Sequence, residues 1–133
     1  MKIIGLGTDI VKINRLKKIF IKNSSFKKRV FSKNEIIYCE KKKTNASCYA
    51  KRFAAKEAFS KALGSGIAKG LKFNEIEVLN NTMGKPSISL RGNSLKTSIK
   101  LLKKKKFNIY LSLSDDYPFA TATVILSTLW KKK

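Results

Sequence analysis

The stretch from Ala46 to Leu63 most constrains the fold, because it is rich in alanine and contains neither proline nor glycine. This composition favours a long helix, and Gly64 suits the position that ends one. On a helical wheel both sides of this helix are apolar, with one acid, Glu57, set between them. Lys61, four residues later, can pair with Glu57 in a surface ion pair of little energetic value. The apolar surroundings favour a functional role for Glu57 instead.

Other local patterns indicate further helices. Apolar residues recur at helical spacing from Ile13 to Phe20. Ser32 and Glu35 have the spacing of a capping box, so a helix should begin near Lys33. A shorter helix is expected over residues 94–102, with Asn93 as its N-cap.

Strands are predicted over residues 2–10, 73–79, 87–90, 107–114 and 120–129. The order of one strand, several helices and then strands with one more helix indicates an α+β fold. We expect one domain over residues 1–130, followed by a frayed basic tail over residues 131–133.

The charge of the chain favours anionic partners. Thirty Lys and Arg residues against 8 Asp and Glu give a net charge of +22. Nucleic acid, an acidic protein and a phosphorylated metabolite all qualify, although much of the excess lies in lysine runs outside any motif. The chain has no histidine, which excludes Ser-His-Asp triads, Cys-His pairs and histidine metal sites. Any acid–base or metal chemistry must therefore use carboxylates, lysines or water.

The two cysteines, Cys39 and Cys48, lack the spacing of metal ligands, and we expect two reduced thiols. The N-terminus shows no charged region followed by an apolar stretch and a cleavage site. No apolar run is long enough to cross a bilayer. These features predict a soluble cytoplasmic protein without a membrane partner.

Asp9 lies at the end of an apolar strand that also contains Gly5 and Gly7. A carboxylate between apolar neighbours needs a partner, and the glycines suggest that something approaches the backbone closely. The alternative is that Asp9 caps the helix that follows. Asp9 and Glu57 together form a plausible site for Mg²⁺, which one or two carboxylates usually hold with water and substrate phosphates. The turn over residues 64–66 and nearby lysines could contact phosphate oxygens.

Two motifs resemble those of the holo-(acyl carrier protein) synthases, in the 4′-phosphopantetheinyl transferase family. Residues 5–11 with Arg15 resemble the first signature, and residues 52–58 with 61–64 and 66–67 resemble the second. The turn over residues 80–86 and the strand over 120–124 are also similar, so the likeness covers about residues 3–127. One departure is Asp115, which follows Ser112-Leu113-Ser114 where many members have histidine.

The resemblance implies that a serine of acyl carrier protein attacks the β-phosphate of coenzyme A and releases adenosine 3′,5′-bisphosphate, in support of fatty acid biosynthesis. Asp9 and Glu57 match the magnesium ligands, and Lys61 matches a catalytic lysine that helps deprotonate the serine directly or through water. The fold implied is that of a phosphopantetheinyl transferase, usually a homotrimer with active sites between subunits. Residues assigned to coenzyme A binding are Arg52, Lys61, Gly64, Ser65, Gly66, Lys85 and Pro86. Those assigned to docking of the acidic carrier protein are Arg15, Lys18 and Lys22.

The main competing interpretation is a nucleic-acid-binding module, because the charge suits phosphate backbones. Against it, the basic runs lack interleaved aromatic residues, and Glu57 is left without a role. A third interpretation is a non-catalytic assembly protein of the same fold. We favour the transferase without a nucleic-acid partner, and leave open whether the base is a metal-ordered water or a carboxylate-assisted path.

Overall fold

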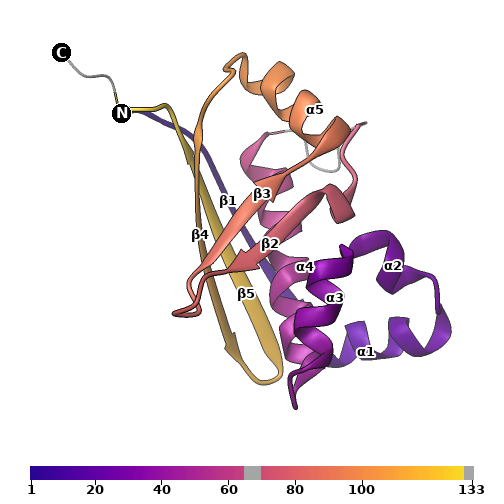
Figure 1. The fold of residues 1–133 in the computed structure, drawn as a ribbon. Coiled ribbons are helices and arrows are strands. Elements are labelled where there is room, and N and C mark those ends of the chain that lie inside the picture. Colours follow the sequence, from indigo (N-terminus) through magenta and orange to yellow (C-terminus); the bar gives the residue numbers. More distant parts are fainter. Residues whose placement is uncertain (65–69, 131–133) are drawn as a thin grey trace.

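The chain begins with a long strand, continues through a run of helices, and ends in strands separated by one more helix, which confirms the predicted α+β class (Figure 1). This fold is that of a computed structural model, which describes residues 1–64 and 70–130. The elements are β1 (Ile3–Lys12), α1 (Ile13–Lys22), α2 (Phe26–Val30), α3 (Lys33–Glu40), α4 (Asn45–Ala62), the 3₁₀ helix η1 (Phe73–Glu75), β2 (Ile76–Asn80), β3 (Pro86–Leu90), α5 (Gly92–Leu102), β4 (Asn108–Asp116) and β5 (Phe119–Ser127). None of the described helices combines the length and apolar content needed to span a membrane.

The strands form two antiparallel sheets. The larger has the order β1-β5-β4, so the last strand pairs with the first, and β2 and β3 form a separate hairpin. Figure 1 shows the helices on one side of the three-stranded sheet, and no helix within the described residues covers its other side. Side chains of β5 alternate accordingly, with Ala120, Ala122, Val124 and Leu126 buried on the helical side.

Helix α4 lies at the centre of the fold, as its two apolar sides require. Ala54, Ala55 and Ala58 are fully buried, and the helix ends one residue before the predicted boundary, with Gly64 in the left-handed region at φ +82°. A Cβ built on Gly7 would collide with the carbonyl oxygen of Ala58. The glycines of β1 predicted that something approaches the strand backbone closely, and helix α4 is what does so.

A buried ion pair fixes α3 and η1 to α4. The expected capping box is present, with the Ser32 hydroxyl accepting from the Glu35 N–H and the Glu35 carboxylate accepting from the Ser32 N–H. The same carboxylate lies 2.8 Å from the ammonium of Lys56, which is completely buried. Lys56 also donates to the backbone carbonyls of Phe73 and Ile76, at 2.8 and 2.5 Å.

Two predictions about local structure are wrong, and one helix was missed. Helix α2 was not predicted, and η1 replaces the first three residues of the strand expected from Phe73. Asn93 lies inside α5 instead of capping it, because the N-cap position is Arg91. The Glu75 carboxylate accepts from the Ser94 N–H at 3.1 Å, so an acceptor distant in sequence does what a local cap would do.

The cysteines also differ from expectation. Cys39 and Cys48 form a disulfide instead of remaining two thiols. The chain reverses between α3 and α4, which brings the two Cα atoms to 5.5 Å, within the usual range for a disulfide. A spacing of nine residues gave no sign of this, because the reversal depends on how the two helices pack.

Candidate functional site

Asp9 and Glu57 line one cavity of about 280 Å³. Asp9 comes from the edge strand β1 and Glu57 from α4, while Arg15 and Ile19 of α1 also line the cavity. Asp9 does not cap α1, because the N-cap position is Lys12 and no side chain provides the cap hydrogen bond. The structure thus brings together the two acids that the sequence singled out.

The two carboxylates influence each other. Burial, followed by the negative charge of Asp9, raises the pKa of Glu57 above its usual value, and Lys61 opposes this in part. Lys61 contacts β1, with its ammonium 3.1 Å from the Asp9 carboxylate and 2.9 Å from the Thr8 carbonyl oxygen. The sequence suggested an ion pair between Glu57 and Lys61. In the structure, Lys61 forms its ion pair with Asp9 instead.

This arrangement fits a hard divalent cation. Asp9 and Glu57 line the same cavity, and the pKa of Glu57 is raised first by burial and then by the negative charge of Asp9. Among the described residues no group of three or more acidic, cysteine or histidine side chains forms a metal cage. Two carboxylates with open positions suit Mg²⁺, which keeps water and substrate phosphate among its ligands. Asp9 and Glu57 are the residues that could hold it.

A second cavity, of about 330 Å³, surrounds Arg52 and is called here the Arg52 cavity. It lies between the C-terminal part of α3, the N-terminal half of α4 and the β2–β3 turn. Its basic and aromatic lining is completed by Tyr38, Lys42 and Lys51, and Pro86 lines it from β3. The predicted coenzyme A residues Arg52 and Pro86 therefore meet in one place.

The guanidinium of Arg52 is buried without an acidic partner. Only 2% of Arg52 is exposed, and within residues 1–64 and 70–130 no carboxylate forms an ion pair with it. It donates to the Asn80 side-chain oxygen and lies 4.4 Å from the centre of the Tyr38 ring. Its Nε has no hydrogen-bond partner among the described residues, and burial lowers the pKa of Arg52. Such a cation suits an anionic ligand, which would supply the missing charge.

The other residues predicted to bind coenzyme A do not line the Arg52 cavity. Lys85 adjoins it, because its neighbours Gly84 and Pro86 are lining residues. Its side chain is exposed in the β2–β3 turn, and its N–H donates to the Asn81 side chain at 2.9 Å. Lys61 lies beside Asp9, and Gly64 ends α4 at the far end from the Arg52 cavity. Ser65 and Gly66 lie outside the described residues. In one chain, the predicted ligand contacts thus fall in two regions.

Asp115, where the resembling family often has histidine, lines the Arg52 cavity. Its carboxylate accepts from the Ser47 hydroxyl at 2.6 Å and lies 3.6 Å from the Lys51 ammonium. The Ser47 hydrogen bond, and then Lys51, lower the pKa of Asp115. Sequence reasoning missed Ser47 and Lys51, although both lie within one helical turn or so of Arg52.

Arg15, Lys18 and Lys22, predicted to dock the carrier protein, are all exposed on α1. Arg15 also borders the cavity of Asp9 and Glu57, so the basic surface continues to the acids. Ile21, which is 85% exposed, adds an apolar side chain that the sequence reading overlooked.

Comparison with known proteins identifies the family to which the chain belongs. Residues 5–122 match the family model described as the 4′-phosphopantetheinyl transferase superfamily. The chain is 47% identical over 126 residues to the holo-[acyl-carrier-protein] synthase of Pelagibacter ubique, covering 95% of this chain and 98% of that protein.

Two solved structures show the same likeness. The holo-(acyl-carrier-protein) synthase of Bacillus anthracis in complex with CoA (3′,5′-ADP) has a TM-score of 0.78 and 34% identity, covering 97% of this chain and 100% of that one. The Helicobacter pylori enzyme in complex with coenzyme A has a TM-score of 0.77 and 35% identity, covering 92% and 99%. The chain therefore belongs to the holo-(acyl carrier protein) synthases of the 4′-phosphopantetheinyl transferase superfamily.

Proposed function

We propose that the chain transfers the 4′-phosphopantetheine of coenzyme A to a serine of apo-acyl carrier protein. The observation that carries this proposal is the meeting of Asp9 and Glu57 in one cavity, in a chain whose relatives are named for this product and are solved with coenzyme A. Attack by the serine oxygen forms a bond to the β-phosphorus of coenzyme A. The diphosphate bond breaks, and adenosine 3′,5′-bisphosphate leaves.

Asp9 and Glu57 would hold Mg²⁺ for this reaction. When bound, the metal supplies charge neutralisation at the diphosphate. The ammonium of Lys61, 3.1 Å from the Asp9 carboxylate, could donate to phosphate oxygens. Lys61 could take the serine proton, directly or through water, only as the neutral amine, whose lone pair accepts it. Phosphoryl transfer of this kind depends on positioning and charge, so it needs no histidine.

The Arg52 cavity is the proposed site for the phosphate-bearing nucleotide part of coenzyme A. Its support is the buried guanidinium without an acidic partner, together with Lys42 and Lys51 on the same lining. Lys61, Gly64, Ser65, Gly66, Lys85 and Pro86 remain proposed contacts to the rest of that ligand.

A homotrimer with active sites between subunits would join these two regions. Five residues separate Arg52 from Glu57, which turns them about 140° apart around α4. One ligand reaches both more readily if neighbouring subunits contribute one each. The uncovered sheet face supports self-association, since Leu6 and Ile10 are both 62% exposed there, with Tyr110 at 48%.

The basic surface of α1 is the proposed docking site for an acidic carrier protein. Opposite charges speed encounter and set orientation, and Arg15, Lys18 and Lys22 offer that charge beside the metal site. Residues 1–130 form the proposed transferase domain. A role in fatty acid biosynthesis and a cytoplasmic location remain predictions.

The direct test incubates the protein with coenzyme A, apo-acyl carrier protein and Mg²⁺ and measures the mass of the carrier protein. We expect a gain of one phosphopantetheine, which is lost when a chelator is added. No gain alongside an active control enzyme would contradict the proposal. A salt-sensitive shift of plain duplex DNA without transfer would favour the nucleic-acid interpretation instead.

A further inference from the structure

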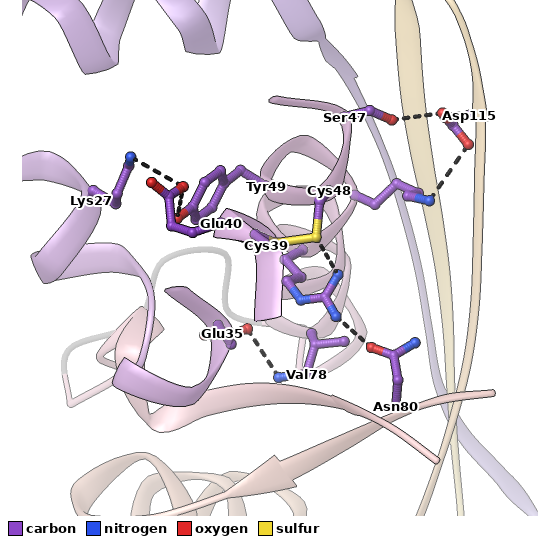
Figure 2. The surroundings of a disulfide bond; sticks show 12 residues. Lys27, Glu35, Cys39, Glu40, Ser47, Cys48, Tyr49, Val78, Asn80 and Asp115 are labelled. Carbon is purple, nitrogen blue, oxygen red and sulfur yellow. Dashed lines mark hydrogen bonds and ion pairs between the residues drawn. A yellow bond between two sulfur atoms is a disulfide. The ribbon is translucent and has the colours of Figure 1, made fainter. Parts of the chain in front are cut away.

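The Cys39–Cys48 disulfide joins α3 to α4 (Figure 2), and its Cys48 lines the Arg52 cavity. Cys39 lies in the last turn of α3 and Cys48 in the first turn of α4. Cys39 is completely buried, whereas Cys48 is 5% exposed and lines the cavity. Of the two cysteines, Cys48 is therefore the one that adjoins the proposed ligand site.

Cys48 also contacts the central cation of the cavity. The Nη1 of Arg52 donates to the Cys48 sulfur at 3.3 Å, and its Nη2 donates to Asn80. The ring that lies against this guanidinium belongs to Tyr38, which directly precedes Cys39 in the chain. Cys48 thus contacts Arg52 directly, and Cys39 is linked to Arg52 through its neighbour Tyr38.

The disulfide holds one end of α3 and the segment that follows it. The other end of α3 is fixed independently by the buried Glu35–Lys56 pair. The residues between the two cysteines include Lys42, Thr44 and Ser47 of the cavity lining. Apart from the disulfide, Glu40 helps to hold this end, because its carboxylate accepts from the Tyr49 hydroxyl at 2.8 Å and lies 3.7 Å from the Lys27 ammonium. Opening the disulfide would remove the covalent tie from this part of the cavity wall, leaving only these non-covalent contacts there, with the rest of α3 in place.

We propose that the Cys39–Cys48 disulfide is a redox-sensitive latch that sets the affinity of the Arg52 cavity for coenzyme A. The inference rests on the proposed function of that cavity. A dithiol reductant donates two electrons and two protons, so the S–S bond becomes two thiols and the reductant becomes a disulfide. The closed latch fixes the lining before the ligand arrives, which removes that ordering cost from binding. The oxidised protein therefore binds coenzyme A more tightly than the reduced protein.

The test compares the oxidised protein, verified by thiol titration and by mass, with protein treated with a dithiol. Calorimetry measures the Kd of adenosine 3′,5′-bisphosphate, and steady-state assays measure KM for coenzyme A and for carrier protein. On reduction we expect the Kd and the KM for coenzyme A to rise about fivefold or more, within the usual range of coupling between sites. The kcat and the KM for carrier protein should change less than about twofold, because α1 and the two acids lie elsewhere.

The single variant Cys39→Ser is the matched control, because it cannot form the disulfide and keeps the Cys48 sulfur that accepts from Arg52. It should show the Kd of the reduced protein and ignore the reductant. Equal Kd values in both redox states would overturn the latch while leaving the transfer reaction intact. Two free thiols after treatment with an oxidant, or a general loss of helical circular dichroism on reduction, would also overturn it. Absence of transfer in both states would contradict the proposed function, and nucleotide binding would still decide the latch.

Discussion

At the scale of single residues, the reaction should depend on both acids of the metal site. Replacing either by its amide, Asp9→Asn or Glu57→Gln, should lower kcat at least about a hundredfold, since metal-ion stabilisation of a transition state is worth several kcal/mol. Each change is nearly isosteric, so the fold should be kept and the melting temperature should not fall appreciably. The measurement is the mass-based transfer assay with thermal unfolding alongside. Asp116→Asn, an exposed acid at the end of β4, is the matched control. Near-normal rates in both variants would show that the metal lies elsewhere.

The pKa of Glu57 gives a second prediction, for the metal-free protein. Because burial and Asp9 raise this pKa above 4.5, the folded state holds the proton more tightly than the unfolded state. The stabilisation from this group is thus complete below pH 4.5 and is lost as the pH rises through the folded-state pKa.

NMR of the Glu57 carboxyl carbon should report titration above 4.5, with Asp9→Asn moving it down because a like charge is removed. Chemical unfolding of Glu57→Gln should lack the corresponding fall in stability. A Glu57 that titrates at its ordinary value, or that ignores the Asp9 substitution, would disprove the coupling.

The sequence predicted the acids better than their surroundings. Glu57 stood out because its neighbours on the wheel are apolar, and this property is local. The partner of Lys61 did not follow from helical spacing, because Asp9 reaches it from another element. Likewise Arg52 matched a motif, but its buried contact with Tyr38 depends on the packing of α3 against α4.

At the scale of elements, Lys56 should be needed for stability. Lys56→Met leaves Glu35 buried without its cation, and breaking a buried pair in this way costs about 3 kcal/mol or more. Lys51→Met removes a partly exposed lysine of the same helix, whose pair with Asp115 spans 3.6 Å, and should cost less than about 1 kcal/mol. Urea unfolding of the two variants measures both. Equal losses would show that the buried pair contributes no more than a surface pair.

Helix α1 provides a test of docking. Reversing two exposed charges, Lys18→Glu with Lys22→Glu, should raise KM for the acidic carrier protein about tenfold, since each exposed pair is worth up to about 1 kcal/mol. KM for coenzyme A should stay nearly constant, and the effect should shrink at high salt. The matched control reverses Lys96 and Lys100, exposed on α5. An equal rise in both KM values, or an equal effect of the control, would remove α1 from the docking site.

Sequence patterns predicted a helix or strand correctly where the contacts that stabilise it lie close together in the chain. The capping box placed the start of α3 correctly, because Ser32 and Glu35 satisfy each other's backbone groups. Helix α2 has only five residues and no side-chain cap, so it left no comparable pattern. The start of α5 was misplaced because its acceptor is Glu75, from a distant part of the chain.

At the scale of the whole molecule, the order of elements indicated the class but not the pairing of β1 with β5. That pairing leaves β1 at the edge of the sheet, with Leu6 and Ile10 on the uncovered face. Exposed edges and apolar faces are sites of association unless something covers them. Leu6 and Ile10 lie in β1 close to Asp9. Association of subunits through this face would therefore affect the site of the reaction as well as the assembly.

Complementation between inactive variants can answer that question. We expect Arg52→Gln and Glu57→Gln each to be inactive alone, but to recover activity when co-expressed in mixed trimers. If one subunit supplies Glu57 and its neighbour supplies Arg52, random assembly leaves roughly a quarter of the sites intact. Sedimentation should report three copies. The control co-expresses Asp9→Asn with Glu57→Gln, and it should recover nothing, because both acids line one cavity of a single chain. Recovery in neither mixture, with mixed trimers verified by mass, would place each complete site within one subunit.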